Sequence, residues 1–145
     1  MADIVDPETR SRMMSGIRAR DTKPELVLRH ALHAAGYRYR LHRRSLPGSP
    51  DLVFVKFRAV IFVHGCFWHR HPRCSKATSP STRPEFWAEK FAKNVERDKR
   101  SRQYLIDAGW RVGTVWECAI KKYRTGDLIQ EVRNWLDSDD QFLAI

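Results

Sequence analysis

The chain has 145 residues, which is long enough for one domain with a sizeable core. It carries 27 lysines and arginines against 17 aspartates and glutamates, so its formal net charge is +10. This charge favours a polyanionic partner, and nucleic acid is the first candidate. The sequence has no apolar run long enough to span a bilayer and no basic helix with a strong apolar face, so a membrane is not an expected partner.

The first twenty residues are polar and rich in arginine. Met1 to Asp6 lack the basic and then apolar order of a secretion signal, so we expect a cytoplasmic protein. We predict that residues 1–20 form an arm or short helix along DNA phosphates, and a solvated N-terminus is an equal alternative. Residues 21–145 are expected to form a single domain, in which residues 64–81 are a metal-binding loop.

A helix is predicted to begin at Thr22. Thr22 followed three residues later by Glu25 is a capping box, and Pro24 falls in the first turn. Apolar residues then recur with helical spacing as far as Gly36, which ends the helix. Capping alone gives Glu25 a sufficient role, and the local pattern favours that role over catalysis.

Three strands are predicted after this helix. Residues 37–42 alternate with period two, as in a strand with one wet face, and residues 43–50 have the composition of a loop. Residues 51–55 and 59–63 are β-branched and aromatic runs, which indicate a hairpin that is buried on both faces.

The predicted hairpin brings two polar side chains together. If its turn centres on Phe57 and Arg58, Asp51 lies directly opposite His64, and directly opposed residues project from the same face. A longer turn would change this register. With the tight turn, a carboxylate and an imidazole meet at the open end of the hairpin.

The second half of the chain predicts more helices and one more strand. Residues 82–85 repeat the capping-box pattern and open a long basic helix that ends at Gly109. Residues 110–116 form a strand, and an amphipathic helix follows Gly126, with frayed residues after it. The order of helix, three strands, helix, strand and helix predicts an α/β domain with a mixed sheet flanked by helices.

The loop at residues 64–81 contains two of the three cysteines. With Cys118 from beyond a later strand, Cys66, His71 and Cys74 supply three thiolates and one imidazole, the closed tetrahedral set of a structural zinc. Such a set leaves no open position at which the metal could activate water. His69 competes with His71 as the ligand, and unlinked thiols are the alternative to a metal.

Asp51 and His69 are candidates for chemistry on phosphate. A carboxylate at a strand end that faces a histidine suits a hard cation such as Mg²⁺, whereas an ordinary turn residue after Pro50 is the alternative. A neutral imidazole at His69 can take a proton from a water that attacks phosphorus. A zinc ligand or a surface histidine that contacts phosphate would look the same in the sequence.

Large aromatic residues accompany the metal loop and the basic helix. Phe67 and Trp68 are neighbours in a polar loop, and Trp87 lies in the first turn of the helix. Apolar side chains can wedge between base steps, and a mismatched step costs less to open. Core packing is the alternative, which fits Trp87 well and the adjacent pair poorly, since neighbours in a short loop rarely both face inward.

Together these residues resemble the very-short-patch-repair (Vsr-type) mismatch endonucleases, which have the restriction-endonuclease-like fold. The resemblance covers about residues 10 to 118, and the run from His64 to His69 is its most specific part. The predicted element order agrees with the α-βββ-α-β core of that fold. The matching segments are Met14, residues 20–22 with Glu25, 46–48 with 50–51, 61–62, 64–69, 82–83, 85–87, 93–98, 109–112 and 116–118.

The resemblance implies a Mg²⁺-dependent nick on the 5′ side of the thymine in a T:G mismatch, which arises when 5-methylcytosine deaminates. The partner is then double-stranded DNA that contains this mismatch. Mismatch-repair proteins and a DNA polymerase would act downstream of a monomeric prokaryotic enzyme.

The resemblance also implies a role for each matching site residue. Asp51 and the backbone carbonyl of Val63 would hold Mg²⁺, and His69 would be the general base. Glu25 and His64 would support the metal-bound water, so Glu25 becomes a site residue as well as a cap. The other implied roles are structural zinc at Cys66, His71, Cys74 and Cys118, entry into the base stack by Phe67, Trp68 and Trp87, and contacts near the mismatch by Met14, Lys90 and Asn94.

One departure from the wider nuclease pattern is informative. Restriction-type enzymes usually carry an acid and a lysine on the strand after the catalytic aspartate, where this chain has Phe62 and His64. The Vsr pattern shares the change. Two alternatives remain open: a zinc module that binds mismatches without cleaving them, and a less selective nuclease of the same fold that cuts matched and mismatched duplexes alike.

Overall fold

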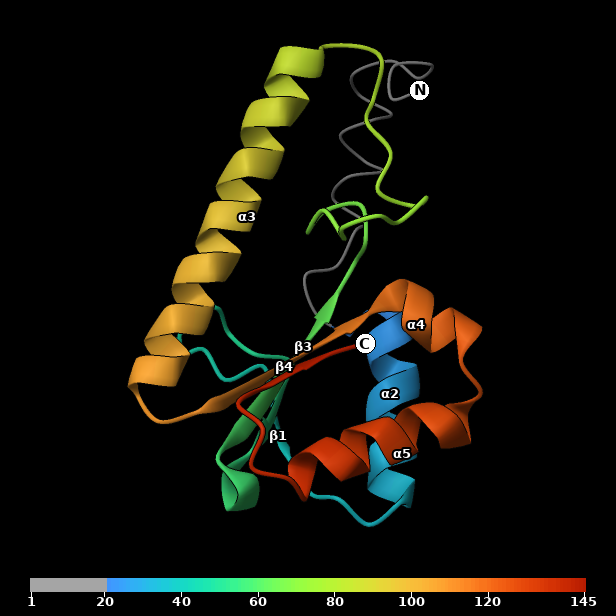
Figure 1. Cartoon of the computed structure of the whole chain (residues 1–145), viewed down its shortest axis with the longest axis vertical. Helices are drawn as coiled ribbons and strands as arrows, with labels where there is room; N and C mark the ends of the chain where they lie inside the picture. Colours follow the sequence, from blue (N-terminus) through green and yellow to red (C-terminus); the bar gives the residue numbers. More distant parts are fainter. Residues whose placement is uncertain (1–20) are drawn as a thin grey trace.

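The computed structural model describes residues 21–145, which form one sheet with helices on both of its faces (Figure 1). The expected arm at residues 1–20, with Met14, lies outside the described residues. No helix in the described part is long and apolar enough to cross a membrane. In chain order the elements are α2 (Lys23–Ala34), β1 (Arg40–Leu41), β2 (Leu52–Phe54), η1 (Val55–Phe57), β3 (Ala59–His64), α3 (Pro84–Asp107), β4 (Arg111–Trp116), α4 (Glu117–Lys122), α5 (Thr125–Leu136) and β5 (Phe142–Ala144).

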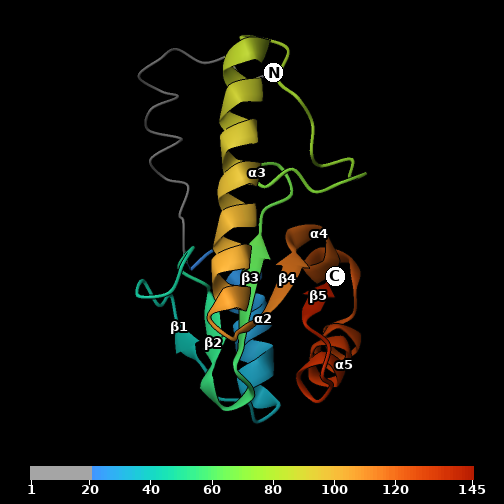
Figure 2. The ribbon, with the colours of Figure 1, turned by 60° about the vertical axis from the view of Figure 1, so that its left-hand side comes forward.

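The described strands form a five-stranded sheet in the order β1-β2-β3-β4-β5. Strand β2 is antiparallel to both of its neighbours, β1 and β3. Strand β4 runs parallel to β3, and β5 runs parallel to β4. The parallel pair β3 and β4 needs a long crossover, which α3 supplies on one face of the sheet (Figure 2). The mixed α/β architecture predicted from the sequence is therefore confirmed.

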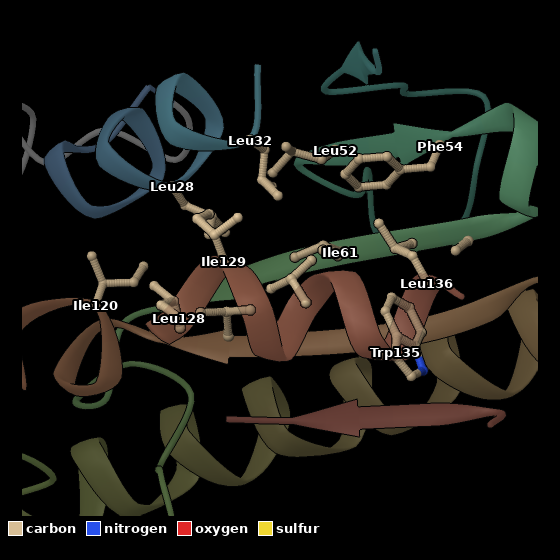
Figure 3. Packing of buried hydrophobic residues seen from close by; sticks show 13 residues of the cluster. Leu28, Leu32, Leu52, Phe54, Ile61, Ile120, Leu128, Ile129, Trp135 and Leu136 are labelled. Atoms are coloured by element: carbon tan, nitrogen blue, oxygen red, sulfur yellow. The ribbon is translucent and has the colours of Figure 1, made fainter. Parts of the chain in front are cut away.

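Two cores, one on each face of the sheet, hold the helices in place. On the first face, α2 and α5 pack their leucines against Leu52 and Phe54 of β2 and Ile61 of β3, and each of these three side chains is fully buried (Figure 3). On the other face, Val53 and Val60 pack with Leu105 of α3. Alternate residues of the hairpin point to opposite cores, so its predicted burial on both faces is confirmed.

The local signals at α2 act largely as predicted. The Thr22 hydroxyl accepts a hydrogen bond of 3.4 Å from the backbone N–H of Glu25. The Glu25 carboxylate, however, accepts from the backbone N–H of Asp21 and not from that of Thr22. Gly36 adopts φ +100°, and the N–H groups of Gly36 and Tyr37 close the end of the helix.

The predicted register of the hairpin is wrong by two residues. The structure pairs Leu52 with Ile61 and Phe54 with Ala59, so the same register continues with Asp51 opposite Phe62 and not His64. The reason is the connection: a 3-10 turn and then Arg58 in the left-handed region at φ 51° join the strands, where a tight turn at residues 57–58 was expected. Because the shift is an even number, Asp51 and His64 still point to the same face.

Three other expectations differ from the structure. The helix α3 begins without a capping box, because Arg83 occupies the N-cap position at φ 55° and makes no side-chain cap. The strand expected over residues 37–42 is reduced to the exposed pair Arg40–Leu41. The C-terminal residues, expected to fray, form β5 and extend the sheet beside β4.

The first half of α3 extends past the end of β3, beyond the sheet, and the loop between β3 and α3 runs beside it (Figures 1 and 2). This overhang places the loop of residues 65–83 next to the aromatic and basic residues at the start of α3. The candidate site lies at the start of β2 and the end of β3, where this loop begins.

Candidate active site

A buried glutamate anchors one half of the site. Glu25 in the first turn of α2 is only 1% exposed. Its Oε1 accepts from the backbone N–H of Asp21 at 3.1 Å, and its Oε2 lies 2.7 Å from both Arg29 Nη1 and His42 Nε2. A buried carboxylate needs such partners, since removal from water penalises an unpaired charge. Glu25 therefore acts as a local cap and also as the centre of a polar network.

Asp51 completes a carboxylate pair with Glu25. It immediately precedes β2, is 9% exposed, and accepts a hydrogen bond of 2.7 Å at Oδ2 from the backbone N–H of Val63. Burial raises the pKa of Asp51 from 3.8 to about 7; the adjacent carboxylate of Glu25 adds to the rise, and the Val63 N–H opposes it. Two adjacent buried carboxyl groups form a donor set whose charge a bound cation would compensate.

A stacked histidine pair forms the other half of the site. The rings of His64, at the end of β3, and His69, in the following loop, lie parallel with centroids 3.8 Å apart. Nδ1 of His69 is 2.7 Å from Oδ2 of Asp98 on α3. A carboxylate only accepts, so this contact places the proton of neutral His69 on Nδ1 and leaves a lone pair on Nε2.

His64 is held neutral in this arrangement. Burial, and to a smaller extent the neighbouring His69, lowers the pKa of His64 to about 3. Its ring also lies near Phe62 and, edge to face, near Trp116 with the centroids 5.2 Å apart. A neutral, well-packed imidazole beside His69 adds no competing positive charge to the site.

The two halves meet at the end of β3. Val63 donates its backbone N–H to Asp51, and the next residue, His64, begins the histidine pair. The sequence prediction that Asp51, His64, His69 and Glu25 gather in one region is thus consistent with the fold. The detailed prediction that Asp51 faces His64 across the hairpin is replaced by a contact between Asp51 and the backbone of Val63.

The predicted zinc ligands form a separate Cys/His cluster, made of Cys66, His71, Cys74 and Cys118. Their ligand atoms all lie within 4.8 Å of one another. Nδ1 of His71 is 3.5 Å from the sulfur of Cys66 and 3.4 Å from that of Cys118. Zn–S and Zn–N bonds of about 2.3 and 2.0 Å at tetrahedral angles imply an S to N separation of roughly 3.5 Å, so this geometry is consistent with a zinc site.

The structure distinguishes the two competing histidines. His71 joins the Cys/His cluster, whereas His69 groups with His64 and Asp98. Burial raises the pKa of the Cys66 thiol to about 12, with smaller contributions from the neighbouring thiols. A metal at this position would offset that cost, because a metal-bound thiol loses its proton.

The strand β4 and the start of α4 brace the Cys/His cluster. The Trp116 ring stacks on His71 with centroids 4.2 Å apart and an angle of 10° between the planes. Glu117 accepts the backbone N–H of Cys66 at 3.1 Å, and Cys118 follows directly. Trp116 contacts both His71 and His64, so a single side chain links the Cys/His cluster to the histidine pair.

The loop aromatics form an aromatic cluster of Phe67, Trp68, Trp87 and Phe91. Phe67 contacts the other three edge to face, at centroid distances of 5.0 to 6.0 Å. The expectation that the adjacent Phe67 and Trp68 would not both pack inward is wrong, since both are partly buried against α3. The overhang of α3 provides the surface on which two neighbouring loop residues can pack.

Polar residues of α3 and the loop hold the aromatic cluster. Asn94 donates to the backbone carbonyl of Trp68 at 3.2 Å, and the Lys90 ammonium lies 6.0 Å from the centroid of its ring. Arg70 lies 4.0 Å from the centre of the Phe91 ring and donates to the carbonyls of Phe67 and of two residues further along the loop. Lys90 and Asn94, predicted near DNA, thus also contact Trp68.

Sequence reasoning missed the roles of Asp98, His42 and Arg29. Asp98 had a detectable signal, since it lies on the same helical stripe as Trp87, Phe91 and Asn94, at spacings of three and four residues. Arg29 also had one, since it follows Glu25 by four residues in the predicted helix, whereas His42 had none. The contact of His42 with Glu25 depends on how the end of β1 returns to α2.

Comparison with known proteins identifies the family. The family model described as DNA mismatch endonuclease Vsr matches residues 2–76, which is more than half of the chain. The chain belongs to the Vsr family. It is therefore a DNA nicking endonuclease, a phosphodiester hydrolase, and nucleases of the Vsr family generally use a divalent metal.

Curated relatives extend the Vsr match over nearly the whole chain. The type II nicking enzyme V.XorIIP of Xanthomonas oryzae is 44% identical, over 94% of this chain and 98% of the relative. The DNA mismatch endonuclease Vsr of Escherichia coli is 46% identical, over 94% and 88% of the respective chains. The type II nicking enzyme V.NmeAIP of Neisseria meningitidis is 38% identical, over 92% and 99%. These matches extend well beyond residue 76, toward the segments that contain Asp98 and Cys118.

Proposed function

We propose that this Vsr-family enzyme nicks double-stranded DNA on the 5′ side of the thymine in a T:G mismatch. The observation that carries the proposal is the stacked pair His64 and His69, backed by Asp98, beside the buried carboxylates of Asp51 and Glu25. The arrangement combines a proton acceptor with a candidate cation site. The E. coli relative named as a mismatch endonuclease supports the choice of substrate.

In the proposed mechanism, His69 is the general base. Its Nε2 lone pair accepts a proton from the attacking water, and the Asp98 carboxylate at Nδ1 fixes the ring and stabilises the imidazolium that forms. His64, neutral and stacked on His69, keeps the ring in its plane and excludes solvent from one face. Removal of a positioned general base typically costs about 10²- to 10⁴-fold in rate.

The carboxylate pair fits a divalent cation. The Asp51 carboxylate and the backbone of Val63 would hold Mg²⁺, with Glu25 supporting its water ligands, because hard cations prefer oxygen donors. When bound, Mg²⁺ polarises phosphate oxygens and lowers the pKa of bound water. The Cys/His cluster would hold a structural zinc with no open position, and Glu117 and Trp116 then keep the loop that carries His69 in place.

Mismatch recognition is assigned to the aromatic cluster and its surroundings. Phe67, Trp68 and Trp87 would insert at the mismatched step, where unstacking costs less than in a matched duplex. Lys90 and Asn94, which contact Trp68 in the free protein, would then lie beside the mismatch. Met14 of the N-terminal segment is proposed to contact the same region.

Two relatives are named as type II nicking enzymes, which favours a variant of the proposal in which the bases flanking the mismatch differ. A series of duplexes with T:G or T:A in varied contexts, with and without Mg²⁺, tests both forms. We expect a nick only at T:G with Mg²⁺. Equal cutting of T:A duplexes would replace the proposal with a less selective nuclease.

Asp51→Asn tests the mechanism. It should abolish nicking of T:G while duplex binding persists, because it removes the charged cation ligand and keeps the side-chain volume. Asp139→Asn, at an exposed aspartate, is the matched control and should nick like the wild type. Wild-type rates in Asp51→Asn would overturn the mechanism.

A further inference from the structure

A histidine outside the implied catalytic set contacts both members of the carboxylate pair. His42 follows β1 directly, and its side chain is 12% exposed. Its imidazole Nε2 lies 2.7 Å from Oε2 of Glu25. Its backbone N–H donates to the backbone carbonyl of Asp51 at 3.1 Å. His42 is thus bonded through its side chain to one acid and through its main chain to the other.

The backbone of His42 is strained in a way that serves both contacts. Its φ of 46° lies in the left-handed region, which a residue other than glycine rarely adopts because its Cβ atom crowds the following carbonyl oxygen. The preceding residues pair with β2 as Arg40 to Val53 and Leu41 to Leu52. This two-residue ladder ends beside Asp51, and the left-handed turn at His42 then directs the imidazole toward α2.

The charge around Glu25 is already compensated without His42. Arg29 Nη1 lies 2.7 Å from Oε2 of Glu25 and 2.7 Å from Oδ1 of Asp21. The guanidinium therefore occupies the space between the acids of this group, which argues against a further metal ion there. What His42 adds is a second, fixed donor at Oε2, and two donors from different directions define the orientation of the carboxylate.

We propose that His42 is a positioning residue of the nuclease, which fixes the Glu25 carboxylate relative to Asp51. The proposal rests on the proposed function for the part that concerns catalysis. Nε2 carries the proton, because the carboxylate accepts. Partners of this kind around a metal site typically contribute about 10- to 100-fold in metal affinity or activity.

Two substitutions separate the side chain from the backbone. His42→Gly keeps the left-handed conformation and the main-chain bond to Asp51 but removes the imidazole. His42→Gln keeps a donor, since the glutamine amide nitrogen reaches about as far as Nε2. His30→Gln, at an exposed histidine on the same helix as Glu25, is the control.

We expect His42→Gly to lower kcat on T:G duplexes by about 10-fold or more and to raise the half-saturating Mg²⁺ concentration by a similar factor. Its KM, and its affinity for the duplex without Mg²⁺, should stay within about twofold, because no contact with DNA is removed. His42→Gln should recover most of the loss. Wild-type kcat and Mg²⁺ dependence in His42→Gly, or equal loss in both variants, would overturn the proposal.

A spectroscopic measurement tests the contact independently of nicking. The ¹⁵N spectrum of the wild-type histidines, assigned by the signals lost in His42→Gln, should show His42 with its proton on Nε2, and Glu25→Gln should shift these signals. A proton on Nδ1, or no response to Glu25→Gln, would refute the contact. If the wild type fails to nick T:G, the proposed function fails alone, and the spectrum still decides whether His42 positions Glu25.

Discussion

Asp51 is a buried carboxyl group whose surroundings disfavour its negative charge. Burial and the nearby Glu25 raise its pKa from 3.8 to about 7. The folded state therefore binds the Asp51 proton more tightly than the unfolded chain does. It follows that the free energy of unfolding falls as pH rises through this interval, by up to ~1.4 kcal/mol per pH unit.

This gives a prediction for the protein without Mg²⁺. Asp51→Asn cannot titrate, so the stability of the wild type relative to this variant should fall by ~1 to 3 kcal/mol between about pH 5.5 and about pH 7.5. Denaturant unfolding of both proteins at each pH measures the difference, and any effect of the cysteines cancels between them. A difference that does not change with pH would show that Asp51 titrates normally in the folded state.

Residue chemistry in the sequence predicted part of this site. Asp51, His64 and His69 were detectable because acids and imidazoles clustered at the ends of apolar runs. Asp98 was not predicted as a site residue although its helical stripe marks it, and His42 was not predicted because it reaches Glu25 only through packing between elements far apart in the chain. The positive φ of His42, on which its contacts depend, leaves no mark in the sequence.

At the scale of elements, the loop between β3 and α3 depends on contacts that come from elsewhere. Its ordered contacts include the Cys/His cluster, the hydrogen bond from Cys66 to Glu117 and the stack of His71 on Trp116. The last two partners and Cys118 all belong to the junction of β4 and α4. The geometry of the loop therefore depends on the junction of β4 and α4, which follows the loop by more than 30 residues in the chain.

Cys118→Ser tests this dependence. We expect one zinc per wild-type chain by elemental analysis, and loss of the metal together with cooperative folding in the variant, because metal binding and folding are coupled. Thermal unfolding followed by circular dichroism measures the second effect. Ser75→Ala, at an exposed position in the same loop, should keep both zinc and stability. A folded, metal-free wild type would refute the zinc assignment.

Elements with strong local patterns were predicted well, and elements fixed by tertiary contacts were not. The apolar spacing of α2 and the stop signal at Gly36 are local, so both were found. The strand β5 was missed, since its three residues form a strand only through pairing with β4. The hairpin register was missed because it depends on the conformation of Arg58, which the residue type does not specify.

At the scale of the whole molecule, the proposed recognition of DNA divides between charge and insertion of aromatic side chains. The net charge of +10 and the many basic residues on the exposed side of α3 favour any duplex, matched or mismatched. The aromatic cluster is formed by Trp87 and Phe91 of the same helix and by Phe67 and Trp68 of the preceding loop. The two contributions to binding should therefore be separable by substitution.

Trp68→Ala should lower the ratio of T:G to T:A affinity by about 10-fold, because loss of one stacking aromatic costs ~1 to 3 kcal/mol. The affinity of this variant should depend on salt concentration as strongly as that of the wild type. Lys99→Ala, on the exposed side of α3, should instead weaken both duplexes equally and reduce the salt slope by about 1. Fluorescence anisotropy at several salt concentrations measures both effects. A wild-type affinity ratio in Trp68→Ala would contradict insertion.

The origin of Cys118 has a consequence for the order in which the enzyme becomes competent during folding. Three of the cluster residues lie close together in the chain, whereas Cys118 directly follows β4, which pairs with β3 in the folded protein. We therefore expect the cluster to be completed only when β4 has joined the sheet. Because the same loop carries His69, the proposed general base, we expect a folding intermediate without this pairing to lack nuclease activity.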